Sequence, residues 1–94
     1  MARFVIKKSG EKEPFDPIKI GNSIRAAAAE ANLTPERTES IVNRVAAVII
    51  EMAAQKEEIA TSEIRARILK ELEILEPSVA EVWKKFEAEH NKTA

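Results

Sequence analysis

Three lysines near the start of the sequence are the residues best suited to chemistry. Lys7 and Lys8 are adjacent and precede the turn dipeptide Ser9-Gly10. Consecutive residues of a regular strand face opposite sides, so both ammonium groups can converge on one ligand only at a strand end, where we expect them. Lys19 follows in the first turn of a predicted helix, whose free N–H groups and dipole favour anions. Together these cations would suit a polyphosphate.

The same lysines have a simpler interpretation as ordinary surface charge, because lysine on an edge strand discourages aggregation. Charge is nevertheless distributed unevenly. Residues 1–25 carry six of the 15 cations and three of the 16 acids, which leaves nine cations and thirteen acids in the remainder. A basic end on a mildly acidic chain suits a small anion better than a long polyanion, so the charge distribution argues against nucleic acid as the partner.

The sequence offers no catalytic or metal-binding constellation. Its single histidine, His90, stands near the end, and it contains no cysteine, which excludes disulfides, zinc ribbons and thiol catalysis. Neither metal-ligand spacing nor a glycine-rich phosphate loop is present. We therefore predict that the protein is not an enzyme and has no catalytic or metal-ligating residues.

A hairpin must position the first lysines. The β-branched and aromatic residues at 4–7 predict a strand, and residues 12–15 its return. Such a small sheet is stable only when packed on helices. We expect Phe4, Ile6 and Phe15 to provide that contact.

Two sites combine a capping side chain with a following proline, and each predicts the start of a helix: Asp16-Pro17 and Thr34-Pro35. Residues 57–60 predict a third short strand, followed by a helix capped at Thr61 or Ser62. These hydroxyls are alternatively placed to contact a phosphate or a ribose. Glu76-Pro77 separates this third helix from a fourth.

Apolar residues recur at helical spacing in all four predicted helices. The predicted core positions are Ile20, Ile24, Ala27, Ala28 and Ala31 in the first, Ile41, Val45, Val48, Ile49 and Met52 in the second, Ile64, Ile68, Leu72 and Leu75 in the third, and Val79, Val82, Trp83 and Phe86 in the fourth. The first helix should end at Asn32 or Leu33. The fourth should fray near His90, within a polar tail at 87–94.

These features predict one domain over residues 1–94 with a mainly helical α+β fold. About four helices form a bundle that is capped by a small two- to three-stranded β-sheet. The sequence contains no apolar run long enough for a membrane span, so we expect no membrane partner. The lack of cysteine fits a reducing cytoplasm.

The ordered set of motifs resembles the ATP-cone, a nucleotide-sensing domain found at the N-terminus of many ribonucleotide reductases and in the transcriptional repressor of their genes. The resemblance covers residues 4–86, and it depends on the whole set and not on any one motif. The matching stretches are Val5-Ile6-Lys7-Lys8-Ser9-Gly10, Glu13-Pro14-Phe15-Asp16, Lys19-Ile20, Ser23-Ile24, Ile41-Val42, Ile59-Ala60-Thr61-Ser62-Glu63-Ile64, Leu69-Lys70-Glu71-Leu72 and Val82-Trp83-Lys84-Lys85-Phe86.

The resemblance implies about four helices capped by a three-stranded sheet, and reversible binding of ATP or dATP as an effector without hydrolysis. Magnesium would accompany the triphosphate. The nucleotide-binding residues that carry over are Val5, Lys7, Lys8, Glu13, Asp16, Lys19 and Thr61. By this resemblance the first-strand residues line the nucleotide, and the two acids contact its base or sugar side or order the hairpin. Lys19 meets phosphate, and Thr61 also contacts the nucleotide.

The sequence departs from the family pattern in two respects. The family often has Lys-Arg where Lys7-Lys8 stands, and lysine lacks the bidentate fork of arginine. Family members also regulate an attached reductase domain or a zinc-ribbon DNA reader, and neither accompanies the cone in this sequence. We therefore expect a free-standing cone that acts through a separate partner protein or through self-association.

Three functions remain open on this basis. The first is a non-catalytic ATP or dATP binding module that acts by nucleotide-dependent association. The second is a helical interaction or oligomerisation bundle that has lost nucleotide binding. The third is a nucleic-acid-binding module, against which the lack of interleaved aromatic and basic residues argues.

The second helix is the expected surface for a homodimer, because its apolar arc is wider than one core stripe. The residues that widen it are Val42, Ala46, Ala47, Ile50, Ala53 and Ala54.

Overall fold

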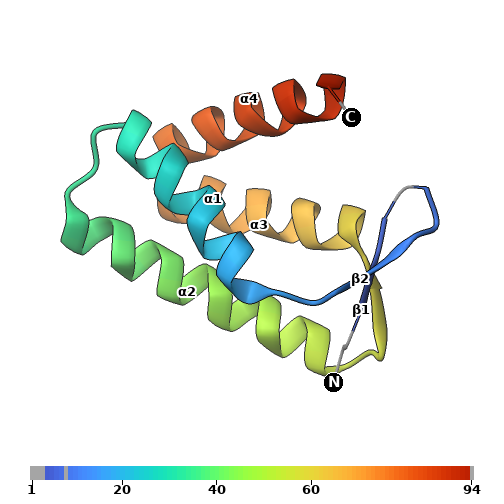
Figure 1. Ribbon diagram of the computed structural model, residues 1–94. Helices are drawn as coiled ribbons and strands as arrows, with labels where there is room; N and C mark the ends of the chain where they lie inside the picture. The colour runs from blue at the N-terminus through green and yellow to red at the C-terminus, as the bar shows by residue number, and fades with distance from the viewer. Residues whose placement is uncertain (1–3, 8, 94) are drawn as a thin grey trace.

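The computed structural model describes residues 4–7 and 9–93. Four helices form a bundle, and a small sheet lies at one end of it (Figure 1). The elements in chain order are β1 (Phe4–Ile6), β2 (Lys12–Pro14), α1 (Pro17–Glu30), α2 (Pro35–Ala54), β3 (Glu58–Ala60), α3 (Thr61–Leu75) and α4 (Pro77–Thr93). The predicted fold class, four helices with a small sheet, is confirmed.

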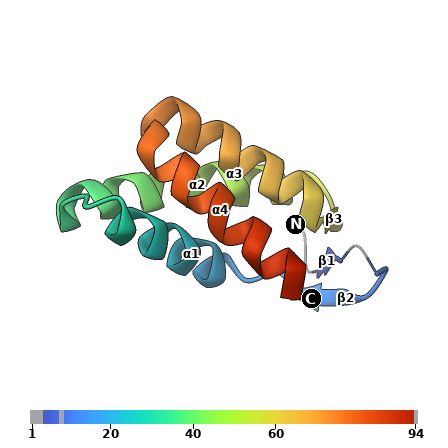
Figure 2. The same cartoon turned by 90° about the horizontal axis from the view of Figure 1, so that it is seen from above.

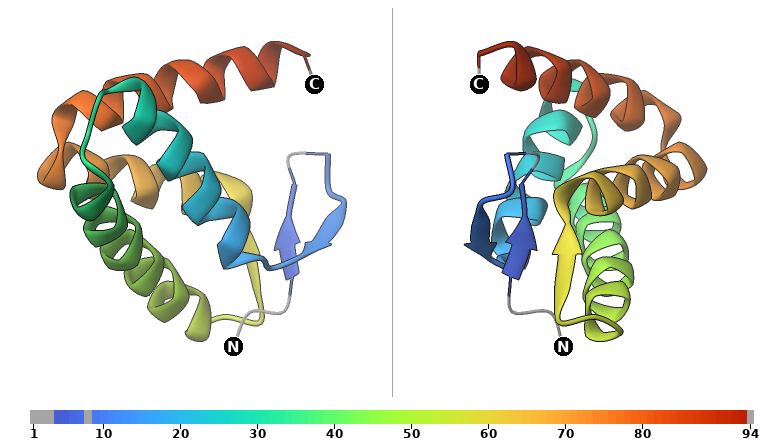
Figure 3. Two further views of the ribbon diagram at one scale, coloured as in Figure 1. Left: turned by 60° about the vertical axis from the view of Figure 1, so that its left-hand side comes forward. Right: turned by 90° about the vertical axis from the view of Figure 1, so that its right-hand side faces the viewer.

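Helix α4 lies across the bundle and contacts both α1 and α3 (Figure 2). Helix α2 packs against α1 and α3 on the other side. This arrangement leaves the sheet beside the first turns of α1 and α3 (Figure 3). The sheet and three of the four helices can therefore surround a common space.

Both predicted caps are present. The Asp16 carboxylate accepts a hydrogen bond from the Ile18 N–H at 3.0 Å, and the Thr34 hydroxyl accepts one from the Arg37 N–H at 3.2 Å. In each case the following proline occupies the first turn, where its missing N–H has no cost.

The chain leaves α1 through a left-handed residue. Asn32 has φ of +63°, a conformation that asparagine tolerates better than most residues. The Leu33 N–H donates to the Ala28 carbonyl at 3.0 Å, and the Asn32 N–H to the Ala29 carbonyl at 3.1 Å. This pair of bonds is the Schellman motif, which satisfies the last carbonyls of a helix. The helix thus ends at Glu30, two residues before the predicted end, and Asn32 and Leu33 close it.

The three strands are arranged in the order β2-β1-β3. β1 pairs with β2 antiparallel and with β3 parallel, so the predicted third strand is confirmed. Gly10, with φ of +92°, makes the turn of the hairpin. Its N–H donates to the Lys7 carbonyl at 2.9 Å, and the Lys7 N–H donates to the Glu11 carbonyl at 2.8 Å.

The predicted inner face of the hairpin is wrong. Val5 is buried and lies beside Ile59 in the parallel register, whereas the Phe4 side chain is 42% exposed. Ile6 is half-buried and is not packed against the core, but Phe15 is, as expected. All three residues of β1 are apolar, so alternation could not reveal its inner face, and a shift of one residue exchanges the faces.

Most predicted core positions of the helices are buried or pack against the core. Helix α2 differs from the prediction, because Val42 and Ala53 are buried and the predicted core residue Val48 is only half-buried. The prediction that Val42 and Ala53 belong to a dimer surface is therefore wrong. Because α2 packs against both α1 and α3, its buried face is wider than a single stripe.

The start of α3 also differs from the prediction. Ala60 occupies the cap position, and no side chain caps this helix. The reason is that β3 passes directly into α3 without a linker, so the cap falls on the last strand residue. Thr61 is instead the first helical residue, and its hydroxyl donates to the Ile6 carbonyl at 3.4 Å.

Helix α4 is longer than predicted, because it continues to Thr93 and does not give way to a polar tail. No glycine or proline follows Pro77, and the alanine, glutamate and lysine residues there have high helix propensity. Polarity alone does not end a helix. None of the helices in the described part of the chain is long and apolar enough to cross a membrane.

We expect Leu72→Ala to lower the free energy of unfolding by about 2–5 kcal/mol, because it removes a fully buried side chain and leaves a cavity. Ile74→Ala on the same helix is the matched control. Ile74 is 68% exposed, so its truncation should change stability by less than about 0.5 kcal/mol. Urea denaturation followed by circular dichroism measures both, and equal effects would contradict the assigned core.

Candidate functional site

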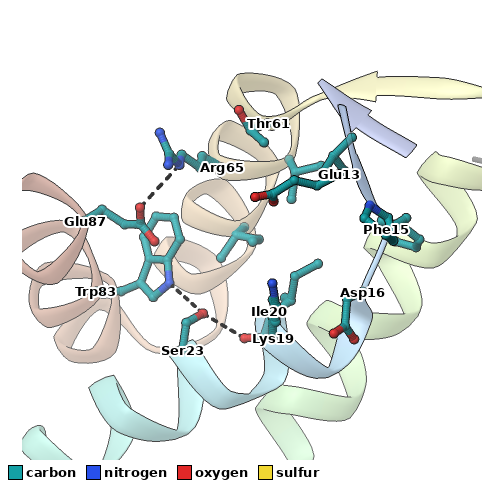
Figure 4. A pocket seen from close by; sticks show the side chains of 14 residues that line it. Glu13, Phe15, Asp16, Lys19, Ile20, Ser23, Thr61, Arg65, Trp83 and Glu87 are labelled. Carbon is teal, nitrogen blue, oxygen red and sulfur yellow. Dashed lines mark hydrogen bonds and ion pairs between the residues drawn. The ribbon is translucent and has the colours of Figure 1, made fainter. Parts of the chain in front are cut away.

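A pocket of about 270 Å³ lies between the sheet, α1, α3 and α4 (Figure 4). Helix α3 contributes one face to it, since its lining residues Thr61, Ile64, Arg65 and Ile68 recur at the spacing of a helix. The N-terminal turns of α1 form the opposite wall, and Trp83 of α4 lies between the two helices. The hairpin and the link to α1 close the remaining side.

The pocket has an apolar interior. Val5, Ile64, Ile68 and Trp83 line it and belong to the hydrophobic core, and the half-buried Phe15 packs against that core. A flat apolar group can be covered on several sides here. Such an environment is typical of sites that bind organic ligands through burial and fix their orientation with a few polar groups.

Charged side chains of both signs also line the pocket. The cations are Lys19 from α1 and Arg65 from α3. The acids are Glu13 from β2, Asp16 from the link and Glu87 from α4. The pocket can thus attract an anionic group only where one of its cations is accessible to that group.

The structure brings together five of the seven predicted site residues: Val5, Glu13, Asp16, Lys19 and Thr61 all line the pocket. Lys7 does not line the pocket, but it pairs with Glu13, which does. Lys8 lies outside the described residues, so its predicted role stays a prediction.

Lys7 and Glu13 form an ion pair across the hairpin, with 2.5 Å between the ammonium nitrogen and Oε1. The hydrogen bond from Lys7, reinforced by its charge and that of Lys19, lowers the pKa of Glu13. The hydrogen bond to Glu13 and the charges of Glu13 and Glu11 raise the pKa of Lys7. Lys7 therefore holds a pocket carboxylate in its ionised form.

Asp16 has a role in the fold that limits its role in binding. Its carboxylate caps α1, so the helix end that we considered for an anion already has a negative group beside it. The first turn of α3 has no side-chain cap, and it begins at the pocket residue Thr61. A side chain thus satisfies one of the first N–H groups of α1, whereas no side chain caps those of α3.

Two interactions at the pocket were not anticipated from the sequence. Arg65 and Glu87 form an ion pair between α3 and α4, with 3.3 Å between Nε and Oε2. Trp83 donates its indole N–H to the Ser23 hydroxyl at 3.2 Å, and Ser23 donates to the Ile20 carbonyl at 2.8 Å. Arg65 follows Thr61 by one turn, which is the signal that could have revealed it.

The fold and pocket define a small α+β domain with a ligand-sized hollow between its sheet and its helices. The chain belongs to the ATP cone domain family, which matches residues 3–91. Domains of this family are typically nucleotide-sensing regulatory modules, and the resemblance noted in the sequence is confirmed.

Two curated relatives are transcriptional repressors named NrdR. The chain is 33% identical over 72 residues to the repressor of Dictyoglomus thermophilum, an alignment that covers 77% of this chain and 47% of the relative. It is 31% identical over 72 residues to that of Chloroflexus aggregans, covering 77% and 40%. The chain thus spans less than half the length of these relatives. Because both act on transcription, the expectation that nucleic acid is not a partner receives no support from them.

We expect Lys7→Gln to raise the pKa of Glu13 toward its ordinary value, because the substitution removes the main group that favours the carboxylate. In the wild type, the pair adds stability above the ordinary carboxyl pKa, and this stability is lost as the pH falls through the lowered pKa of Glu13. An NMR titration of the Glu13 side chain measures the change. Lys12→Gln is the control, because Lys12 pairs with Glu58; an equal shift in both variants would contradict the assignment.

Proposed function

We propose that the protein is a non-catalytic regulatory module that binds ATP or dATP in the pocket between the hairpin, α1, α3 and α4. The observation that supports this most directly is the combination of an apolar interior with Lys19 and Arg65 in a pocket of an ATP cone domain. An adenine base is flat and largely apolar on its faces, whereas the triphosphate needs cations. The pocket offers both kinds of contact.

The size of the pocket supports a partly enclosed ligand. At about 270 Å³ it is slightly smaller than most small-molecule sites, which span roughly 300–1,000 Å³. The base and sugar would fill the interior beside Trp83 and Phe15. The phosphates would extend toward Lys19, Arg65 and the uncapped start of α3, with Lys7 and Lys8 approaching from the hairpin.

Glu13 and Thr61 would then contact the sugar. A carboxylate accepts hydrogen bonds from hydroxyls, and the threonine hydroxyl can donate or accept. Val5 would pack against the nucleotide from β1, and Asp16 would order the link while capping α1. These assignments keep all seven residues implied by the family resemblance.

Magnesium would enter with the triphosphate. In the described part of the chain, no group of three or more histidine and acidic side chains is arranged to hold a metal ion. Magnesium often binds through phosphates and retains several waters. The protein would therefore recognise the metal mainly through the nucleotide.

The proposed output is a change in association with a second copy or with a separate partner. A nucleotide can shift such an equilibrium only if its affinity differs between the two states. On α2, Ala47, Ile50 and Ala54 remain exposed after Val42 and Ala53 enter the core. This smaller apolar surface would be the contact.

ATP with magnesium should raise the melting temperature of the protein, because a ligand that binds only the folded state stabilises it by mass action. Lys19→Ala should weaken this effect several-fold, since it removes a cation from the pocket. Differential scanning fluorimetry measures the melting temperature, and isothermal titration calorimetry measures the affinity for ATP. Lys70→Ala, on the exposed face of α3, is the control and should bind like the wild type.

The absence of a shift at millimolar nucleotide would contradict the proposal and favour the interaction bundle instead. The bound nucleotide should also be recovered intact. Steady phosphate release that survives repurification and is lost in Lys19→Ala would contradict the non-catalytic role.

Sedimentation velocity at tens of micromolar should show a nucleotide-dependent change in mass if self-association is the output. Ile50→Glu should abolish that change while the monomer still binds nucleotide, because it places a charge on the exposed surface of α2. A monomer in both conditions would exclude self-association and leave a separate partner as the route.

A further inference from the structure

The Arg65–Glu87 ion pair occupies a cation that an anionic ligand would need. Both residues line the pocket, and Figure 4 shows their side chains meeting across the gap between α3 and α4. The side chain of Arg65 is 42% exposed and that of Glu87 is 26% exposed. The guanidinium is therefore accessible from the pocket, but its Nε is already paired with the Glu87 carboxylate.

The other cations around the pocket show why this pair is important. Lys7 is engaged by Glu13, and Lys19 is the remaining described cation that lines the pocket. The pocket itself contains three acids and two cations, so its own charge is unfavourable for a polyphosphate. An anionic ligand gains most by taking Arg65, whose planar guanidinium binds phosphate in a bidentate manner.

We propose that Glu87 is an internal competitor for Arg65, and that the phosphates of a bound nucleotide displace it. Arg65 exchanges the carboxylate for the ligand, and the strength of the Arg65–Glu87 pair sets the affinity of the pocket. This inference rests on the proposed function, since it concerns the same site and the same ligand.

The exchange gives α4 a direct link to the ligand. In the part of the chain that the structure describes, Arg65–Glu87 is the ion pair that joins α3 to α4. Trp83 remains anchored one turn earlier through its burial and its hydrogen bond to Ser23. Ligand binding therefore frees the Glu87 carboxylate while the start of α4 stays in place, so the signal reaches α4 at Glu87.

The test is a set of four proteins: wild type, Glu87→Gln, Arg65→Gln and the double variant. Glutamine in place of Glu87 keeps the size of the side chain and removes its charge. Glutamine in place of Arg65 approximates the length of the aliphatic stem and also removes the charge. The affinity for ATP with magnesium is measured at about 0.15 M salt, where charges more than about 8 Å apart are screened. The chain has one tryptophan and no tyrosine, so Trp83 fluorescence reports the pocket, and calorimetry checks it.

Glu87→Gln should bind ATP about two- to fivefold more tightly, the size expected from losing a partly exposed ion pair as a competitor. Arg65→Gln should bind more weakly. In the Arg65→Gln background the further Glu87→Gln change should give no gain, because no guanidinium remains to compete for. A gain in affinity of the same size in both backgrounds would show that removing a negative charge near the ligand is sufficient, and it would overturn the proposal.

Two controls isolate the effect. Glu81→Gln makes the same chemical change on α4, but Glu81 pairs with Lys84 on the exposed face, so affinity should not change. Adenosine, which has no phosphates, should bind Glu87→Gln and wild type equally. Equal affinity of wild type and Glu87→Gln for ATP would overturn the competition while leaving the proposed function intact. If the wild type binds no ATP, both proposals fail.

Discussion

The fold depends on the contact between a very small sheet and the helical bundle. Three strands of three residues cannot be stable in water by themselves. Val5 and Ile59 join this sheet to the core, and they are paired with each other in the register of β1 and β3. The sheet therefore exists because the helices cover one of its faces. The pocket exists for the same reason, because the strands, once held there, form its fourth wall.

The charges around the pocket are balanced so that few of them are free. Lys7 is paired with Glu13, Arg65 with Glu87, and the Asp16 carboxylate is occupied by the start of α1. Such exposed pairs add little stability individually. Under the proposed function, phosphate binding at Lys7 or Arg65 would be an exchange of partners, in which a contact within the protein is released. Occupancy can thus alter the connection between elements without unfolding any of them.

The sequence predicted the elements well, because caps and breakers are local signals. Asp16-Pro17, Thr34-Pro35 and Glu76-Pro77 mark helix boundaries through the conformational limits of proline and through short-range hydrogen bonds. The inner face of β1 was not predictable, since all three of its residues are apolar and the face is chosen by packing. The cap of α3 was misassigned because the strand before it leaves no room for a linker.

The pocket was predictable only in part. Residues of the hairpin and of α1 lie close in sequence, so a motif can contain them. Arg65 and Glu87 come from separate helices, and their meeting depends on how α4 crosses α3. Arg65 could have been found only through its place one helical turn after Thr61, and Glu87 has no local signal that distinguishes it from other surface charges. The resemblance to the ATP-cone identified a pocket residue far from the hairpin in sequence only where a family motif includes that residue, as with Thr61.

The parallel pairing of β1 with β3 has a consequence for the order of folding. Thr61 and Ile6, which meet at this junction, are 55 positions apart in the sequence, and α1 and α2 lie between them. Local helical turns and hairpins form quickly, whereas contacts between distant segments must first overcome the entropy of closing a long loop. The junction of β1 with β3 therefore belongs with the long-range contacts of the fold, like the Trp83–Ser23 hydrogen bond, whose residues are 60 positions apart. During synthesis the wall of the pocket that these strands form cannot be completed until β3, which follows α1 and α2 in the chain, has been made.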